Sequence, residues 1–101
     1  MACPGETGDL VLMNYYDPYQ NSCASNPQVL ADLQVLNTTI QTDAAQQNAV
    51  VADVFGAFGG ATTPNPNICT YTWMCNITPN IHATTAGYSV MAGTFEAATG
   101  Y

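Results

Sequence analysis

The stretch that decides the fold is DLVLMNYY, residues 9–16. It is a continuous apolar run in which polar and apolar residues do not alternate. Such a run predicts a strand buried on both faces, as in a parallel sheet. A second run of this kind, AVVADVF, occupies residues 49–55 and is ended by GAFGG. The segment between the two runs is long enough for the crossover that parallel strands require.

That segment predicts one long helix running to about residue 47. Asn26 is a candidate N-cap, and Pro27 suits the first helical position because its missing N–H has no partner there anyway. The apolar stripe at helical spacing consists of Val29, Leu30, Leu33, Leu36 and Ile40. The polar side carries Gln28, Asp32, Gln34 and Gln41. Strand, helix and strand in this order predict a βαβ unit.

The rest of the chain predicts a loop and a final helix. Residues 59–81 are rich in turn formers, and we expect an irregular loop there. Thr84 or Thr85 is expected to cap a helix that carries Tyr88, Met91, Ala92 and Phe95 on one face. The fold class is therefore α/β, with a small parallel sheet and flanking helices in a single domain, residues 1–101. Sites in such folds lie at the carboxyl ends of the strands.

Composition excludes several kinds of partner. The 101 residues include no lysine and no arginine, and seven acids give a net charge of −7. We expect no nucleic-acid binding, because nothing replaces the phosphate counterions, and no attraction to anionic membranes. No apolar run approaches the ~20 residues of a membrane span. The first residues, MACPGETGD, show no signal peptide.

The cysteines and two sequons favour an oxidising, extracytoplasmic compartment. The cysteines are Cys3, Cys23, Cys69 and Cys75. With no CxxC spacing and a single histidine, we expect no zinc, other metal or cofactor. We predict a disulfide between Cys69 and Cys75 across a short loop. Cys3 and Cys23 can pair in the same way, although four cysteines allow three connectivities. Asn37-Thr-Thr and Asn76-Ile-Thr are glycosylation sequons typical of secreted chains.

Four stretches carry a resemblance to a known family. They are LVLMNYYDPY, VVADVFGAF, CTYTWMC and NIHATTAGYSVMAGTF, in this order. Together they resemble the C-terminal half of secreted SGNH (GDSL-type) ester hydrolases, over roughly residues 9–96. The resemblance implies a partial doubly wound fold and makes His82 the general base that activates a serine. Imidazole suits that role because it exchanges a proton near neutral pH.

The chain departs from the family in two places. Where the family has an aspartate that orients the histidine, this chain has Pro79 and Asn80, and Asn80 can bond the ring but cannot stabilise imidazolium as a carboxylate does. The Gly-Asp-Ser block that holds the family's nucleophile is missing. The most similar stretch, TGDL at residues 7–10, has Leu10 where the family has the serine. Ser22 and Ser25, in a loop after the first strand, are the serines that can approach His82; Ser89 lies on the final helix.

Other polar and aromatic residues have two interpretations each. Asp17 and Asp53 can approach the His82 loop or cap turns, and Asn14 can line a site. Tyr71 and Trp73 can form an aromatic lip or pack over the core.

Three hypotheses about function follow. The first is a serine-type ester hydrolase, or its derivative, acting on small carboxylic esters. The alternatives are a non-catalytic secreted structural module and a truncated hydrolase with a changed fold. Two parallel strands alone leave open edges and bare apolar surface, so we also predict a homo-oligomer formed by strand-edge pairing or swapping.

Overall fold

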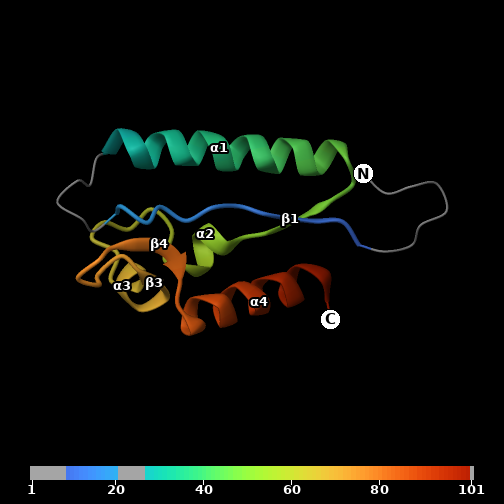
Figure 1. Cartoon of the computed structure of the whole chain (residues 1–101). Coiled ribbons are helices and arrows are strands. Elements are labelled where there is room, and N and C mark those ends of the chain that lie inside the picture. The colour runs from blue at the N-terminus through green and yellow to red at the C-terminus, as the bar shows by residue number, and fades with distance from the viewer. Residues whose placement is uncertain (1–8, 21–26, 101) are drawn as a thin grey trace.

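The computed structural model describes residues 9–20 and 27–100, and this part of the chain is mixed α/β (Figure 1). Its elements in chain order are β1 (Val11–Met13), α1 (Pro27–Gln46), β2 (Val50–Ala52), α2 (Val54–Ala57), α3 (Asn67–Tyr71), β3 (Thr72–Trp73), β4 (Asn80–Ala83) and α4 (Thr85–Thr99). The prediction of an α/β chain with a small parallel sheet and flanking helices is confirmed.

β1 and β2 are parallel, and α1 connects them. The register pairs Val11 with Val50 and Met13 with Ala52. Both strands are shorter than the apolar runs that predicted them, and the prediction that they are buried on both faces is wrong. β1 is half-buried throughout, and Val50 of β2 is 42% exposed, because a sheet of two strands is not covered completely by its helices. The second run ends as a helix because the Asp53 carboxylate accepts a hydrogen bond from the Gly56 N–H at 3.0 Å and so caps α2.

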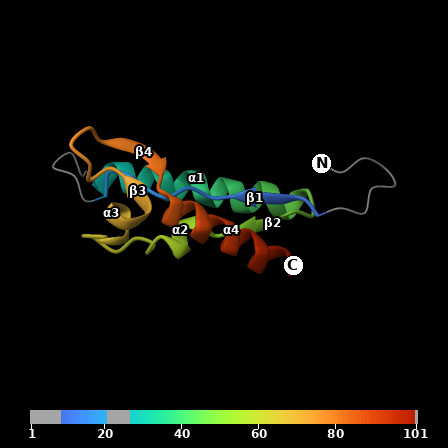
Figure 2. The same cartoon turned by 60° about the horizontal axis from the view of Figure 1, so that its bottom comes forward.

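The helices cover the two faces of this sheet, with α1 on one side and α4 on the other (Figures 1 and 2). The main core lies on the α4 side, where Val54, Phe58 and Ile68 are buried together. The Phe58 ring stacks on Tyr16 at a centroid distance of 4.6 Å and meets Tyr71 at 5.0 Å. Aromatic rings from three segments therefore close the core at the carboxyl end of β1.

α1 begins at Pro27 as predicted, while Asn26 lies outside the described residues. The side facing the sheet is narrower than the predicted stripe and consists of the half-buried Leu30, Leu33, Asn37 and Ile40 and the buried Ala44. The assignment of Val29 and Leu36 to the buried stripe was wrong, because both are exposed. The physical reason is the width of the sheet. A sheet of two strands covers only a narrow stripe along α1, so side chains at the borders of the predicted stripe stay exposed.

Asn37 joins α1 to the chain that leaves β1. Its Oδ1 accepts a hydrogen bond from the Tyr15 N–H at 2.9 Å, and its Nδ2 donates to the Tyr15 carbonyl oxygen at 3.0 Å. One carboxamide thus satisfies both polar groups of a peptide backbone just beyond the end of the strand. This explains why a polar residue lies within the half-buried side of the helix.

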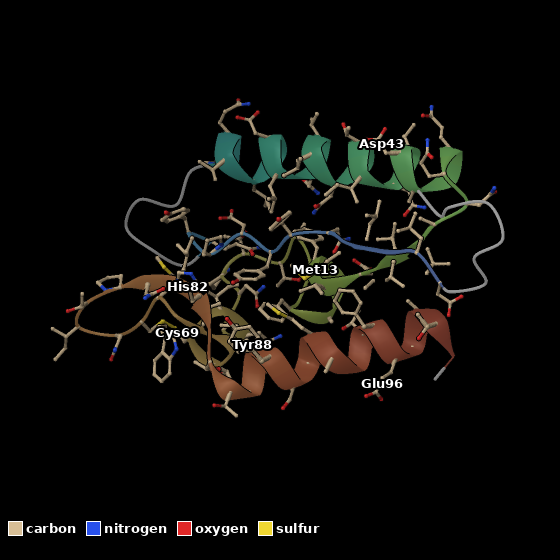
Figure 3. The ribbon with its side chains drawn as sticks, turned by 45° about the vertical axis from the view of Figure 1, so that its right-hand side comes forward. Met13, Asp43, Cys69, His82, Tyr88 and Glu96 are labelled. Atoms are coloured by element: carbon tan, nitrogen blue, oxygen red, sulfur yellow. A yellow bond between two sulfur atoms is a disulfide. The ribbon has the colours of Figure 1, made fainter. Side chains whose placement is uncertain are left out.

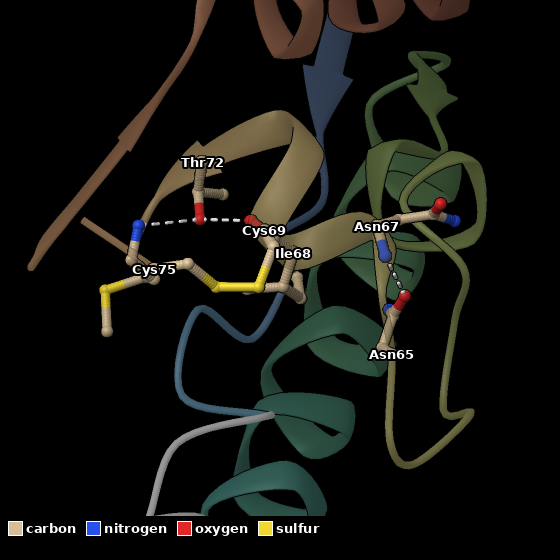
Figure 4. Close-up of a disulfide and its surroundings, with 7 residues drawn as sticks. Asn65, Asn67, Ile68, Cys69, Thr72 and Cys75 are labelled. Atoms are coloured by element: carbon tan, nitrogen blue, oxygen red, sulfur yellow. Dashed lines mark hydrogen bonds between the residues drawn. A yellow bond between two sulfur atoms is a disulfide. The ribbon is translucent and has the colours of Figure 1, made fainter.

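The segment 59–81 is more regular than predicted. It contains α3 and β3, and it ends in β4, which pairs antiparallel with β3. The predicted disulfide between Cys69 and Cys75 is confirmed, with the two Cα atoms 5.2 Å apart (Figure 4). The Thr72 hydroxyl donates to the Ile68 carbonyl oxygen at 2.5 Å and accepts from the Met74 N–H at 3.2 Å. Residues 59–81 therefore form a small folded unit that the disulfide and the hydrogen bonds of Thr72 stabilise.

α4 begins after Thr84, one of the two predicted caps. The Thr84 hydroxyl accepts a hydrogen bond from the Gly87 N–H at 3.2 Å. Gly87 is buried, and a Cβ at this position would overlap the carbonyl oxygen of Tyr71. Only glycine therefore allows the first turn of α4 to approach the end of α3 this closely.

Candidate functional site

An open pocket of about 470 Å³ lies where the chain leaving β1, strand β4 and helix α4 meet. The described residues that form its walls are apolar and aromatic apart from one imidazole. They are Met13, Tyr15, Tyr16, Pro18, Ile81, His82, Tyr88 and Met91. Figure 3 shows Met13, His82 and Tyr88 on these three elements. The pocket is at the carboxyl end of β1, where α/β folds place their sites.

The lining residues differ in depth. Met13, Tyr16 and Met91 are half-buried and pack against the core cluster, so they form the inner wall. The outer wall is more accessible: Tyr15 is 50%, Ile81 47% and Tyr88 56% exposed. An apolar group of a ligand can contact the inner wall, while a polar group attached to it meets His82 near the surface.

His82 lies on β4 with Asn80 as its hydrogen-bond partner. The Asn80 side-chain oxygen accepts the backbone N–H of His82 at 2.8 Å and lies 2.5 Å from the ring atom Nδ1. Because this oxygen can only accept, the contact requires a proton on Nδ1, and in the neutral ring the lone pair then lies on Nε2. This is the tautomer that a general base needs.

Hydrogen bonds hold the chain in place on both sides of His82, at Ile81 and at Thr84. The Tyr16 hydroxyl donates to the Ile81 carbonyl oxygen at 2.7 Å. At the other end, the Thr84 hydroxyl donates to the Thr70 carbonyl oxygen at 2.9 Å. These bonds tie β4 to the exit of β1 and to α3, so the position of His82 depends on both.

Tyr16 is a protonated donor in this arrangement. Burial of its ring raises the pKa of the Tyr16 hydroxyl above its ordinary value, and the neighbouring Tyr88 adds to the rise. The neutral form is the one that donates to Ile81. The bond to β4 is therefore maintained throughout the neutral pH range.

The acids and the remaining asparagine have structural roles. Asp17 is buried and accepts the Tyr19 N–H at 2.9 Å within a turn. Asn14 is buried too; its Nδ2 donates to Asp53 Oδ1 at 2.8 Å and its Oδ1 accepts the Phe55 N–H at 2.8 Å. None of the three lines the pocket. Of the two interpretations given to Asp17 and Asp53, the structure supports capping: Asp17 caps a turn and Asp53 caps α2.

Tyr71 and Trp73, the two residues considered for an aromatic lip, lie in different environments. Tyr71 packs on Phe58 in the core, whereas Trp73 is 47% exposed on β3. Neither residue lines the pocket. The aromatic residues that do so are Tyr15, Tyr16 and Tyr88.

The serines expected to act as nucleophile are not among the residues that the structure describes. Ser22 and Ser25 lie outside the described residues, and within residues 9–20 and 27–100 the only serine is Ser89. Ser89 is exposed on α4 and does not line the pocket. The structure therefore brings together Asn80 and His82 among the candidate catalytic residues.

Sequence reasoning missed the pocket-lining role of Met13 and Tyr88. Tyr88 and Met91 were placed together by their helical spacing, but this spacing is the same for a core face and for a pocket wall. Over the described part of the chain, no group of three or more His, Cys, Asp or Glu side chains is arranged to hold a metal ion. No helix there is long and apolar enough to span a membrane.

Comparison of the chain with models of protein families, with curated proteins and with solved structures finds no match.

Proposed function

We propose that this chain is, or derives from, a secreted serine-type ester hydrolase that acts on small carboxylic esters. The observation that carries the proposal is the pair Asn80–His82 beside an apolar pocket, with Nε2 free to accept a proton. The resemblance to the C-terminal half of SGNH hydrolases adds to this, because there too the base is a histidine before the last helix.

The proposed reaction is acyl transfer in two steps. His82 Nε2 takes the proton of an attacking hydroxyl while the oxygen bonds to the ester carbonyl carbon, and then returns it to the leaving alkoxide. Water repeats the sequence on the acyl-enzyme and releases the carboxylic acid. The hydroxyl comes from Ser22 or Ser25, or from a serine of a second chain. Asn80 holds the ring but adds no negative charge to stabilise the imidazolium.

Charge favours uncharged substrates. The chain has no lysine or arginine, and no carboxylate is among the described residues that line the pocket. An anionic acyl group would lose its hydration with no cation to compensate. A neutral ester binds by its apolar part, and the carboxylate product leaves readily.

Two further features belong to the proposal. The Cys69–Cys75 disulfide is consistent with an extracytoplasmic location. The two-stranded parallel sheet favours a homo-oligomer, because a sheet this small is marginal by itself and has open edges.

The second candidate is a non-catalytic secreted module. It is favoured by the exposed position of Ser89, the only serine in the described residues, away from the pocket. The chain would then keep the pocket and the histidine of a hydrolase without its chemistry.

Hydrolysis of a short-chain 4-nitrophenyl ester tests the two. If the chain is an esterase, the rate falls at least ~10²-fold in His82→Ala, and a serine-directed phosphonate blocks it. Ser89→Ala is the matched control and keeps full activity. Ser22→Ala and Ser25→Ala identify the nucleophile if it lies in this chain. A rate equal to that of His82→Ala favours the non-catalytic module.

A further inference from the structure

Two Asn-x-Thr sequences, at residues 37–39 and 76–78, have no part in the proposed hydrolysis. Such a sequence is the acceptor for N-linked glycosylation. The transfer reads the asparagine and the hydroxyl residue two positions later, so both side chains must be presented together. The surroundings of the two sequences differ in this respect.

The sequence at Asn37 is engaged within α1. Residues two positions apart on a helix do not face each other, so Thr39 points away from Asn37. The Thr39 hydroxyl donates to the Val35 carbonyl oxygen at 3.1 Å. Both polar atoms of the Asn37 carboxamide bond the Tyr15 backbone. A sugar on this nitrogen would separate the helix from the end of β1.

The sequence at Asn76 is open. It forms the exposed bend between β3 and β4, and Ile77 at its centre is fully exposed. Within the described residues, no hydrogen bond is made by the side chain of Asn76 or of Thr78. The Asn76 backbone N–H donates to the Trp73 carbonyl oxygen at 3.2 Å, which keeps the segment in a turn. A turn permits the asparagine and threonine side chains to approach one another.

The loop formed by residues 74–79 also has room for a large group. Its base is closed by the Cys69–Cys75 disulfide and by the pairing of Trp73 with Asn80. Figure 1 shows it at the end of the molecule opposite the C-terminus. Residues 74–79 do not line the pocket, so a glycan here leaves the pocket accessible. It would also shield the exposed Ile77 side chain from other apolar surfaces.

We propose that Asn76 is an N-glycosylation site and that Asn37 is not. Asn76 Nδ2 forms a bond to C1 of the first sugar of a lipid-linked oligosaccharide diphosphate, whose C1–O bond breaks. The amide loses one proton and the lipid diphosphate leaves. The modification rests on the extracytoplasmic location proposed above, and it is independent of ester hydrolysis.

The test is secretion of the full chain from a eukaryotic host, behind a cleavable secretion signal, with a reporter of known glycan occupancy secreted in parallel. Intact mass is measured before and after endoglycosidase treatment. The wild type is expected to carry one glycan, as is Thr39→Ala. Thr78→Ala and Asn76→Gln are expected to carry none. The two threonine variants are matched, because each removes one acceptor sequence and leaves both asparagines in place.

Three results would overturn the proposal: an unmodified wild-type chain beside an occupied reporter, a glycan retained in Thr78→Ala, or a glycan lost in Thr39→Ala. Thr78 is exposed and makes no side-chain hydrogen bond in the described residues, so its variant is expected to secrete and to form the disulfide as the wild type does. Ester hydrolysis measured before and after glycan removal is expected to be the same. Loss of the glycan and loss of esterase activity are thus distinguishable outcomes.

Discussion

The side-chain oxygen of Asn80 lies 2.5 Å from Nδ1 of His82 and 2.8 Å from the backbone nitrogen of the same residue. The backbone N–H is a donor in every state, so the atom that accepts it must be the oxygen of the carboxamide. Through that oxygen, Asn80, which lies two positions before His82 on the same strand, determines which ring nitrogen carries the proton. The consequences can be measured, because the chain has a single histidine.

The neutral imidazole of His82 is expected to be mainly the Nδ1–H tautomer. Nitrogen-15 chemical shifts at pH 8 report this for one residue without assignment ambiguity. Asn80→Ala removes the acceptor, and the tautomer populations are then expected to move towards those of free histidine, in which Nε2–H predominates. Equal spectra for the two proteins would contradict the bond.

Asn80→Asp is expected to increase ester hydrolysis. A carboxylate at this position stabilises the imidazolium that forms when the base takes its proton, and the reverse change in a catalytic triad can cost ~10⁴ in kcat. We therefore expect a gain of up to about 10⁴ in kcat/KM with a short-chain ester. The gain should vanish when His82→Ala is added; a gain that survives in the double variant would mean that the new carboxylate acts without His82.

Tyr16→Phe is expected to change the alkaline limit of stability. The folded state holds the Tyr16 proton more tightly than the unfolded chain does, because burial and Tyr88 raise its pKa. As pH rises above ~10, the unfolded chain releases this proton first, so the free energy of unfolding falls. Below that pH the group contributes no pH dependence. Urea denaturation at pH 8 and pH 11 measures the fall, which should be smaller in Tyr16→Phe.

At pH 8 the same variant loses the hydrogen bond from the Tyr16 hydroxyl to the Ile81 carbonyl oxygen. The expected cost is about 1 kcal/mol of unfolding free energy. An identical fall between the two pH values in wild type and variant would show that Tyr16 is not the group responsible.

Leu33→Ala is expected to lower the free energy of unfolding by ~1–3 kcal/mol. Leu33 lies in the middle of the α1 side that faces the sheet, but it is only half-buried, so the cost is below that of a fully buried leucine. The control is Val35→Ala on the same helix, whose side chain is 66% exposed and should change stability by less than ~0.5 kcal/mol. Equal effects of the two substitutions would mean that α1 is rotated from the orientation described.

The purified chain is expected to associate. β1 and β2 form a two-stranded sheet whose outer edges have no partner strand within the described residues, and Val50 is 42% exposed beside one edge. Repulsion between chains of charge −7 is screened beyond ~8 Å at physiological salt. Light scattering coupled to size exclusion at micromolar concentration measures the mass. A single species of 10.7 kDa would contradict this prediction.

What the sequence by itself determined is local. Pro27 begins α1, Thr84 caps α4, and Cys69 is bonded to Cys75, because each feature depends on residues within a few positions of one another. The parallel pairing of β1 and β2 was also predictable, since two apolar runs with a helix between them allow few other arrangements. The sequence placed Asn80 near His82 but left open which group orients the ring, and the Asn80–His82 contact itself is seen only in the structure.

Only the tertiary structure decided what depends on distant contacts. Helical spacing identified Tyr88 and Met91, but whether that face would close against the core or form a pocket wall depended on Met13 and Tyr16, from the other end of the chain. The exposure of Val29 and Leu36 followed from the width of a two-stranded sheet, which no residue of α1 encodes. α3 and β3 form within a stretch rich in turn residues because packing of Ile68 and Tyr71 against Phe58 outweighs weak local preference. Burial against distant segments, which local patterns do not specify, is the physical reason for all three.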